Sequence, residues 1–450
     1  MNRRIALAVA AVAVGAVAVW GVATATTPPA RLTLWTTQLG TPQEDTGAAV
    51  AVSSNGMTCL YGRTTGEFVD AIGTDDTDVF LSCYDKLGSR KWVRQIGTAG
   101  SDVPSNSFAI ANNGDVYIAG TTDGEFPNEF QEGGQDVFVA KFNKNGALRF
   151  VKQFGGSGDD QAWGLTRAPS GDLYLAINTS SNDFPSGSLS ANQYVGETDS
   201  ALVKLSRNAD LKWARQFGSA QNDWAWGVSV SRKGEIYVAG TTFGDIDGAG
   251  SEVFHGTDST TGDGFVMRFD RDGRRLWTRQ VGGTGNDQMY GVATDTLGSL
   301  YVAGFTDGAL GTTGLLASAG GTDGVVMKMT KEGVVQWVHQ HGSAGDEREW
   351  SIVVDRRNRV YVAGFTTGAL DGYANLGASD AYVLRLSATG SPTSHRQFGT
   401  PGIDATETYG TSVGVSPWGN VVLVGTTTSA VWGHPNAGLI DAYLTVLPGF

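Results

Sequence analysis

Three features of the sequence predict an all-β fold built from seven similar units. A hexamer of the form WARQFG recurs seven times, three further short β-rich segments recur between its copies, and turn residues are abundant. Of 450 residues, 64 are glycine and only 17% are charged, as expected of turn-dense β structure. Repeats of about 60 residues suit four-stranded antiparallel sheets packed around an axis, so we expect a seven-bladed β-propeller.

The hexamer defines one strand of the unit. Its copies begin at Trp35, Trp92, Phe150, Trp213, Trp277, Trp337 and Ser394. The glutamines of successive copies are 57, 58, 63, 64, 60 and 57 residues apart. This spacing exceeds one solenoid turn and matches one blade.

Three other strands are expected between successive hexamers. They are typified by WGVSVS from Trp226, EIYVAG from Glu235 and DGFVMRF from Asp263, each bounded by turn residues. The unit is therefore four strands, A to D, with the hexamer as D. A lone sheet of this kind exposes two faces and two edges, which radial packing covers.

The two ends of the chain complete one blade. The sequence opens with a D strand over residues 32–40 that no A, B or C strand precedes. It closes with a C strand over residues 441–447 that no D strand follows. We therefore expect the N-terminal strand to close the ring, with the propeller occupying residues 32–450.

These motifs carry a family resemblance. The pattern W-x-x-Q-x-G, then D, then Y-V-A-G, then D-x-x-V-x-K resembles the bacterial seven-bladed β-propeller (SBBP-type) repeat family, over nearly all of the chain after Ala30. The resemblance implies a propeller exported from bacterial cells, and it implies no catalytic motif.

The N-terminus predicts export. Arg3 and Arg4 precede an uncharged stretch over residues 5–23, and the small-x-small site ends at Ala25. We expect residues 1–25 to be a signal peptide and 26–31 a short linker. The 19-residue stretch approaches the length of a membrane span, so an uncleaved anchor over residues 5–23 remains the alternative. The protein is then secreted, periplasmic or at the cell surface.

The net charge restricts the partners. A formal charge of −13, without a basic stripe in the sequence, argues against a nucleic-acid partner. We expect membrane contact only through the N-terminal segment, and a monomer.

When the seven repeats are aligned, two positions change together from one repeat to the next. Five units place Tyr on strand B and Lys or Arg on strand C, whereas unit one has Cys59 and Cys83 and unit seven has Val422 and Val446. Cross-strand neighbours would explain this coupling. We expect cation–aromatic contacts in five blades and a disulfide between Cys59 and Cys83, with two buried thiols as the alternative.

Two acidic columns run around the ring. One begins every C strand: Asp78, Asp136, Asp199, Asp263, Asp323, Asp380 and Asp441. The other lies seven residues after each glutamine: Asp45, Asp102, Asp160, Asp223, Asp287, Glu347 and Asp404. Because a catalyst needs asymmetry while a fold needs the same turn seven times, we interpret both columns as structural.

An aromatic residue begins several A strands. These candidate ligand-binding residues are Trp163, Trp226, Tyr290, Trp350 and Tyr409. Strand A is expected innermost, so the rings would gather at one mouth of a central channel, where sugars or peptides could stack. Packing between blades is the alternative. The long B–C loops over 178–197 and 241–262 are the other expected site of recognition.

Other candidate sites are weaker. His339 and His341 share one strand face, but no third metal ligand is visible, so we expect surface histidines and no metal or cofactor. Calcium remains an alternative at 245–248. We favour a non-catalytic extracytoplasmic scaffold that binds a protein or glycan. A carbohydrate hydrolase or lyase using ring carboxylates and a structural envelope component remain open.

Overall fold

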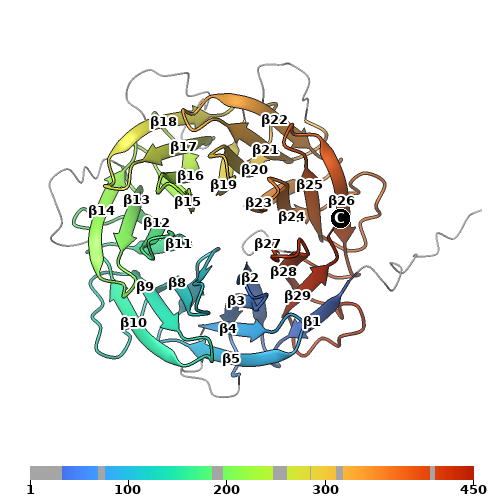
Figure 1. The fold of residues 1–450 in the computed structure, drawn as a ribbon, viewed down its shortest axis with the longest axis horizontal. Helices are drawn as coiled ribbons and strands as arrows, with labels where there is room; N and C mark the ends of the chain where they lie inside the picture. The colour runs from blue at the N-terminus through green and yellow to red at the C-terminus, as the bar shows by residue number, and fades with distance from the viewer. Residues whose placement is uncertain are drawn as a thin grey trace, which may run out of the picture. The chain divides into compact units, whose positions relative to one another are not determined.

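The computed structural model shows seven four-stranded antiparallel blades around a central axis (Figure 1). It describes residues 33–68, 77–184, 196–246, 261–283, 285–310, 318–405 and 411–449. The expected signal peptide and linker lie outside these residues. The predicted all-β fold and the count of seven blades are confirmed.

Each blade orders its strands A to D from the axis outward. The A strands are β2 (Asp45–Val52), β6 (Asp102–Pro104) with β7 (Ala109–Ile110), β11 (Asp160–Arg167), β15 (Asp223–Val230), β19 (Asp287–Thr294), β23 (Glu347–Val354) and β27 (Ser412–Val415). The B strands are β3 (Thr58–Thr64), β8 (Val116–Thr122), β12 (Leu173–Thr179), β16 (Ile236–Thr242), β20 (Leu300–Thr306), β24 (Val360–Thr366) and β28 (Val421–Thr427).

The outer strands follow the same order. The C strands are β4 (Asp78–Tyr84), β9 (Asp136–Phe142), β13 (Asp199–Leu205), β17 (Asp263–Phe269), β21 (Asp323–Met329), β25 (Asp380–Leu386) and β29 (Asp441–Leu447). The D strands are β5 (Arg90–Ile96), β10 (Leu148–Phe154), β14 (Leu211–Phe217), β18 (Arg275–Val281), β22 (Val335–His341), β26 (Pro392–Phe398) and β1 (Trp35–Leu39).

The N-terminal strand closes the ring as predicted. Strand β1 pairs antiparallel with β29, with Trp35 opposite Val446 and Leu39 opposite Ala442. Blade seven is therefore assembled from both ends of the chain. No other blade depends on a contact so distant in sequence.

The two ends of the ring differ in their connections. Because consecutive strands of a blade are antiparallel, the A–B and C–D turns lie at one end, which we call the turn face. The B–C loops and the connections to the next blade lie at the other end, the loop face. The chain enters the propeller at the turn face, where Leu34 N–H donates to the Val446 carbonyl at 2.7 Å.

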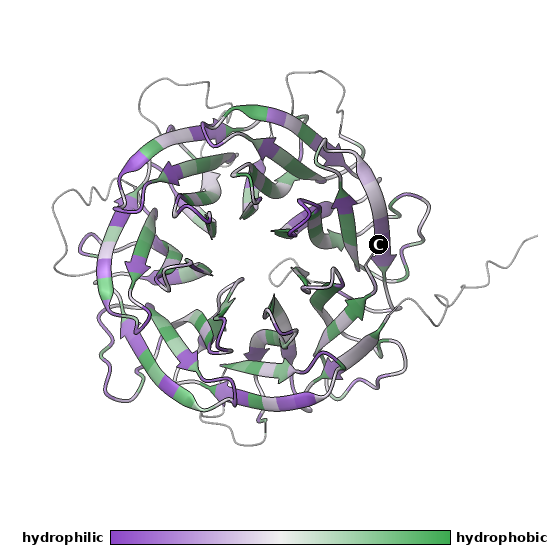
Figure 2. Cartoon of the chain, viewed as in Figure 1, coloured by the Kyte–Doolittle hydropathy of each residue, from purple (hydrophilic) through white to green (hydrophobic). Residues whose placement is uncertain are grey.

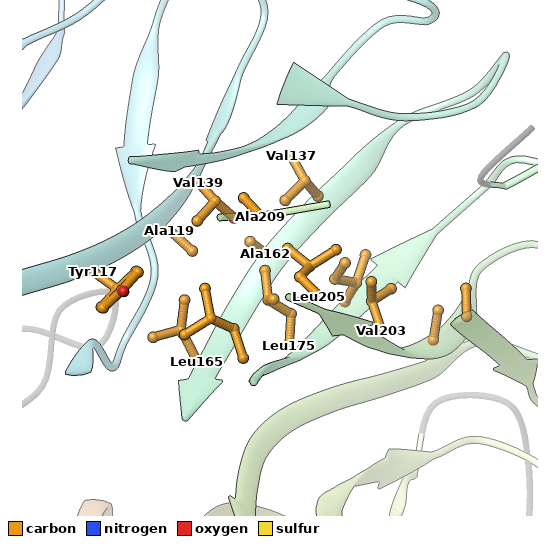
Figure 3. Packing of buried hydrophobic residues seen from close by; sticks show 14 of the residues in the cluster. Tyr117, Ala119, Val137, Val139, Ala162, Leu165, Leu175, Val203, Leu205 and Ala209 are labelled. Atoms are coloured by element: carbon orange, nitrogen blue, oxygen red, sulfur yellow. The ribbon is translucent and has the colours of Figure 1, made fainter. Parts of the chain in front are cut away.

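The core lies between neighbouring blades. Val137 and Val139 of blade two pack against Ala162 and Leu165 of blade three (Figure 3). Strands B and C are apolar on both sides because each is covered by two blades, whereas the outermost D strands alternate polar and apolar residues (Figure 2). Ring closure therefore buries every seam.

The coupled columns are cross-strand partners. Cys59 lies opposite Cys83 and forms the expected disulfide. Lysine ammonium groups lie 5.0 to 5.3 Å from the Tyr ring centres in three blades. In one of the other two blades, Arg268 forms an ion pair with Glu235. In the other, the Arg359 guanidinium lies 5.6 Å from the Tyr361 ring centre.

Candidate functional site

The glutamine of each hexamer holds the aspartate that begins the C strand of the same blade. The distances from Gln Nε2 to the Asp carboxylate are 2.9, 2.7, 3.0, 3.1, 2.9, 2.7 and 2.8 Å in the pairs Gln38–Asp441, Gln95–Asp78, Gln153–Asp136, Gln216–Asp199, Gln280–Asp263, Gln340–Asp323 and Gln397–Asp380. In blade one the same glutamine also accepts from Phe68 N–H and donates to the Gly66 carbonyl. It thus ties strands C and D to the B–C loop.

The glycine and tryptophan of the hexamer also have structural roles. A Cβ on Gly97 would lie 1.6 Å from the Asp78 carboxylate, so only glycine fits beside the held aspartate. The Trp92 indole lies against Gly146 in the C–D turn of blade two, and its Nε1 donates to the Lys144 carbonyl at 3.1 Å. The tryptophan therefore joins successive blades.

The acidic residues that begin the A strands are buried and hydrogen-bonded locally. Each accepts from the backbone N–H four residues earlier, as Asp160 does from Gly156 at 2.7 Å. Burial raises the pKa of Asp102 to about 7 and those of Asp160, Asp223 and Asp287 to about 6. These carboxylates stabilise the connection between blades, which leaves little of their surface for a ligand.

Four of the five candidate aromatic residues form a continuous arc at the axis. Trp163 meets Trp226 edge-on with ring centres 4.6 Å apart, Trp226 lies 5.3 Å from Tyr290, and Tyr290 stacks on Trp350 at 4.2 Å. We call these four residues the aromatic arc. The fifth candidate, Tyr409, lies outside the described residues.

A β-bulge presents each ring of the aromatic arc. The A–B register shifts at Trp163, Trp226, Tyr290 and Trp350, so each is the extra residue of its strand. Such a bulge redirects a side chain without ending the strand. The next residue must be small, because a Cβ on Gly227 would lie 2.4 Å from the Tyr290 carbonyl oxygen.

The arc borders a cavity at the axis. Its volume is about 90 Å³, and Trp226, Tyr290 and Trp350 line it on one side, with Asn106 and Ser107 of blade two across from them. Blades one and two carry Ala48 and Asn106 where the arc carries rings. The cavity is therefore asymmetric, although the repeats that surround it are alike.

A second asymmetric cluster lies in the seam between blades five and six, and we call it the histidine seam. His341 Nε2 of β22 is 2.9 Å from the Glu349 Oε1 of β23, and the Tyr382 ring lies 5.6 Å from the imidazole. His339 stacks on His341 at 5.3 Å, and the His395 Nδ1 lies 3.3 Å from Asp371 Oδ2. The expectation that His339 and His341 are surface residues is wrong for His341, whose side chain is only 16% exposed.

Burial and charge set the protonation of this seam. Burial lowers the pKa of His339 and of His395 to about 4, which keeps both rings neutral near pH 7. Burial also opposes the charged form of His341, but the Glu349 carboxylate outweighs it and raises the pKa of the imidazole. The seam thus holds a buried ion pair. At the position of His341, the D strand of blade three has the buried apolar residue Phe217.

Exposed charge is divided between the two faces. Fifteen of the 16 exposed basic side chains in the described residues lie in A–B turns, C–D turns or the first two residues of D strands, alongside only 3 exposed acids. They are Lys86, Arg90, Lys91, Lys144, Arg149, Arg207, Lys212, Arg232, Lys233, Arg271, Arg274, Arg275, Lys331, Arg356 and Arg357. The remaining exposed charges are 10 acids and Lys152.

The other candidate sites are less well described. Residues 247–260 and 185–195 lie outside the described part of the chain, and with them half of the calcium candidate and most of the long B–C loops. Among the residues that are described, no group of three or more His, Cys, Asp or Glu side chains is arranged to hold a metal ion. Within the same residues no helix is long and apolar enough to cross a membrane.

Comparison with known families agrees with the repeat pattern. The SBBP β-propeller repeat model matches residues 91–127, 212–247 and 276–311, each running from a D strand into the following B–C loop. Three of the seven repeats therefore match the SBBP β-propeller repeat, and the chain folds as a seven-bladed β-propeller.

Similar proteins share the repeat over part of their length. The regulatory protein FlaEY of Caulobacter vibrioides is 29% identical over 191 residues, which cover 41% of this chain and 20% of FlaEY. An uncharacterized WD repeat-containing protein, L264 of Acanthamoeba polyphaga mimivirus, is 25% identical over 220 residues, or 42% of this chain and 16% of that protein. The chain therefore matches only a minor part of these relatives.

A solved structure shares the fold. A PL25 ulvan lyase bound to -[GlcA(1-4)Rha3S]- superposes with a TM-score of 0.52 at 11% identity, covering 92% of this chain and 97% of the lyase. At this identity the similarity shows the propeller architecture alone.

Within the SBBP repeats, departures from the shared columns mark the candidate sites. The Gln, Asp and Gly columns recur in all seven blades and hold the blades together. In the described residues the aromatic arc lies in blades three to six, and the sequence had not singled out Glu349 and Tyr382 of the histidine seam. Their signal was available, since Glu349 occupies a position that is Ala162 and Ala225 in other repeats.

Proposed function

We propose that this SBBP propeller is an extracytoplasmic, non-catalytic protein that binds a neutral glycan at the aromatic arc. The single observation that carries the proposal is the arc itself, four neighbouring rings of which Trp226, Tyr290 and Trp350 line an asymmetric cavity. Aromatic faces stack on the C–H faces of sugars, and concave surfaces with a few polar groups are the usual ligand sites.

Polar groups beside the arc suit sugar hydroxyls. The Tyr290 hydroxyl donates to Gln288 Oε1 at 2.7 Å, and Asn106 and Ser107 face the rings across the cavity. Amide and hydroxyl groups can both donate and accept, as recognition of a polyol requires.

The charge of the loop face favours a neutral ligand. Away from the turn face, the described residues expose 10 acids and a single lysine. This surface would repel a uronic or sulfated polymer such as the one bound by the structurally similar lyase. The ring carboxylates are buried and already accept backbone hydrogen bonds, which favours binding over the alternative of a hydrolase or lyase.

The compartment is part of the proposal. A disulfide joins the only two cysteines, and disulfides persist mainly in oxidising compartments. The apolar segment over residues 5–23 is consistent with export.

The test is titration of purified protein with neutral oligosaccharides on a glycan array and by calorimetry. Trp226→Ala should weaken binding by about 10-fold or more, from the loss of one stacking ring. Trp226→Phe should retain part of the affinity, and Trp418→Ala, at an exposed tryptophan of the turn face, should retain all of it. Equal binding by Trp226→Ala and Trp418→Ala, a preference for anionic glycans, or steady cleavage of the ligand would each contradict the proposal.

A further inference from the structure

The turn face combines positive charge with exposed apolar side chains. Its turns and D-strand starts expose 15 basic side chains and 3 acids, although the whole chain carries a net charge of −13. The same turns and strand starts, with Leu34 just before β1, hold nine of the 15 large hydrophobic residues that are exposed in the described part of the chain, including Leu87, Leu297 and Trp418. Net charge alone therefore misrepresents this surface.

The turns of successive blades adjoin, so these side chains share one surface. The Trp277 Nε1 of blade four donates to the Lys331 carbonyl in the C–D turn of blade five at 2.9 Å. In the inner ring, Thr296 Oγ1 donates to Asn358 Oδ1 at 2.9 Å between the A–B turns of blades five and six. Inner and outer turns of neighbouring blades are therefore in contact at these places.

We propose that the turn face docks on an anionic lipid bilayer. Lys and Arg near an anionic surface each contribute about 1 kcal/mol, a factor of about five in partitioning. Exposed leucines beside them can enter the boundary between headgroups and acyl chains. This combination fits a lipid surface better than a nucleic acid, because a bilayer has a continuous apolar layer that several leucines can enter together. The inference is independent of the proposed glycan binding.

The position of the N-terminus agrees with this orientation. The chain enters the propeller at Leu34, on the turn face. Only ten residues, 24–33, separate it from the apolar stretch over residues 5–23, and ten residues reach at most about 35 Å. If that stretch is retained in a membrane, it would tether the propeller by the end of β1 that lies on the turn face.

The experiment uses the chain without residues 1–25, which keeps all strands from β1 to β29 and so closes its own ring. Binding is measured by cosedimentation with vesicles of phosphatidylglycerol and phosphatidylcholine, or of phosphatidylcholine alone. We expect binding only to the anionic vesicles, and its loss at 1 M salt, where the Debye length falls to about 3 Å.

Matched variants test the surface. Arg356→Gln with Arg357→Gln should weaken binding by about 10-fold or more, because two charges near the lipid are removed. Leu297→Ser should weaken it several-fold, whereas Phe130→Ser should leave it unchanged, since both are large apolar residues with 77% exposure but Phe130 lies on the loop face. Unchanged melting temperatures would establish that all variants fold.

Three results would overturn the inference. The first is equal binding to both kinds of vesicle. The second is an equal loss of vesicle binding in Phe130→Ser and Leu297→Ser. The third is binding to duplex DNA that is tighter than binding to anionic vesicles and that Leu297→Ser does not alter. The last result would assign the face to a nucleic acid.

Discussion

Replacing Gln38 by alanine should destabilise the propeller more than a single polar substitution usually does. The Gln38 side chain donates to the Ser429 carbonyl, Asn436 Oδ1 and Asp441 Oδ2 at 3.1, 3.0 and 2.9 Å, and accepts from Val431 N–H at 2.9 Å. A bond to a carboxylate contributes about 1.5–3 kcal/mol and a neutral one about 1 kcal/mol. Allowing for water entry, we expect the free energy of unfolding to fall by about 4 kcal/mol.

Gln38 is also the clearest test of ring closure, because β1 is held to blade seven by side chains from the other end of the chain. Urea unfolding followed by tryptophan fluorescence measures the loss. Gln336→Ala, at an exposed site of D strand β22, is the matched control and should change stability by less than about 0.5 kcal/mol. If the two variants unfolded at the same urea concentration, the role assigned to the hexamer glutamine would be wrong.

Three further predictions concern buried groups. Glu349→Ala should cost about 3–5 kcal/mol in urea unfolding by leaving His341 without its partner, whereas adding His341→Phe should restore stability to near the starting value; a larger loss in the double variant would contradict an ion-pair role. Because burial raises the pKa of Asp102 to about 7, the folded state binds its proton more tightly, and the stability this contributes is present below pH 4 and lost as the pH rises through 7. Asp102→Asn should therefore raise stability at pH 8 by about 2–4 kcal/mol and flatten its dependence between pH 4 and 7, and thermal melts across this range that showed no gain would refute it. Reducing the Cys59–Cys83 bond, whose cysteines are 24 residues apart, should lower the free energy of unfolding by about 3 kcal/mol, while a Cys59→Ser, Cys83→Ser variant should not respond to the reductant.

Much of the fold could be predicted because its information is local and repeated seven times. The spacing of the hexamers, the order of strands and the unmatched strands at the two ends specify the blade count and the closure by β1. The coupled substitution at Cys59 and Cys83 located a cross-strand pair. Such features depend only on the alternation of strands and turns within one unit.

Contacts between blades were harder to predict from the sequence, because they join residues about 60 positions apart on separate sheets. The aligned repeats showed that Trp226 and Tyr290 occupy the same position of the A strand. Only the structure shows that a bulge at this position brings the rings together at the axis. It also placed His341 on an outer strand, yet Glu349 from the next blade covers that histidine and makes it part of a buried pair.

The sequence alone thus determined the number, order and closure of the blades, since each follows from a pattern within the chain. The tertiary structure decided which unlike residues share a seam and which face collects the basic turns, since both depend on how seven sheets lie around one axis. A net charge of −13 could not reveal a basic turn face, because a sum over the chain carries no direction.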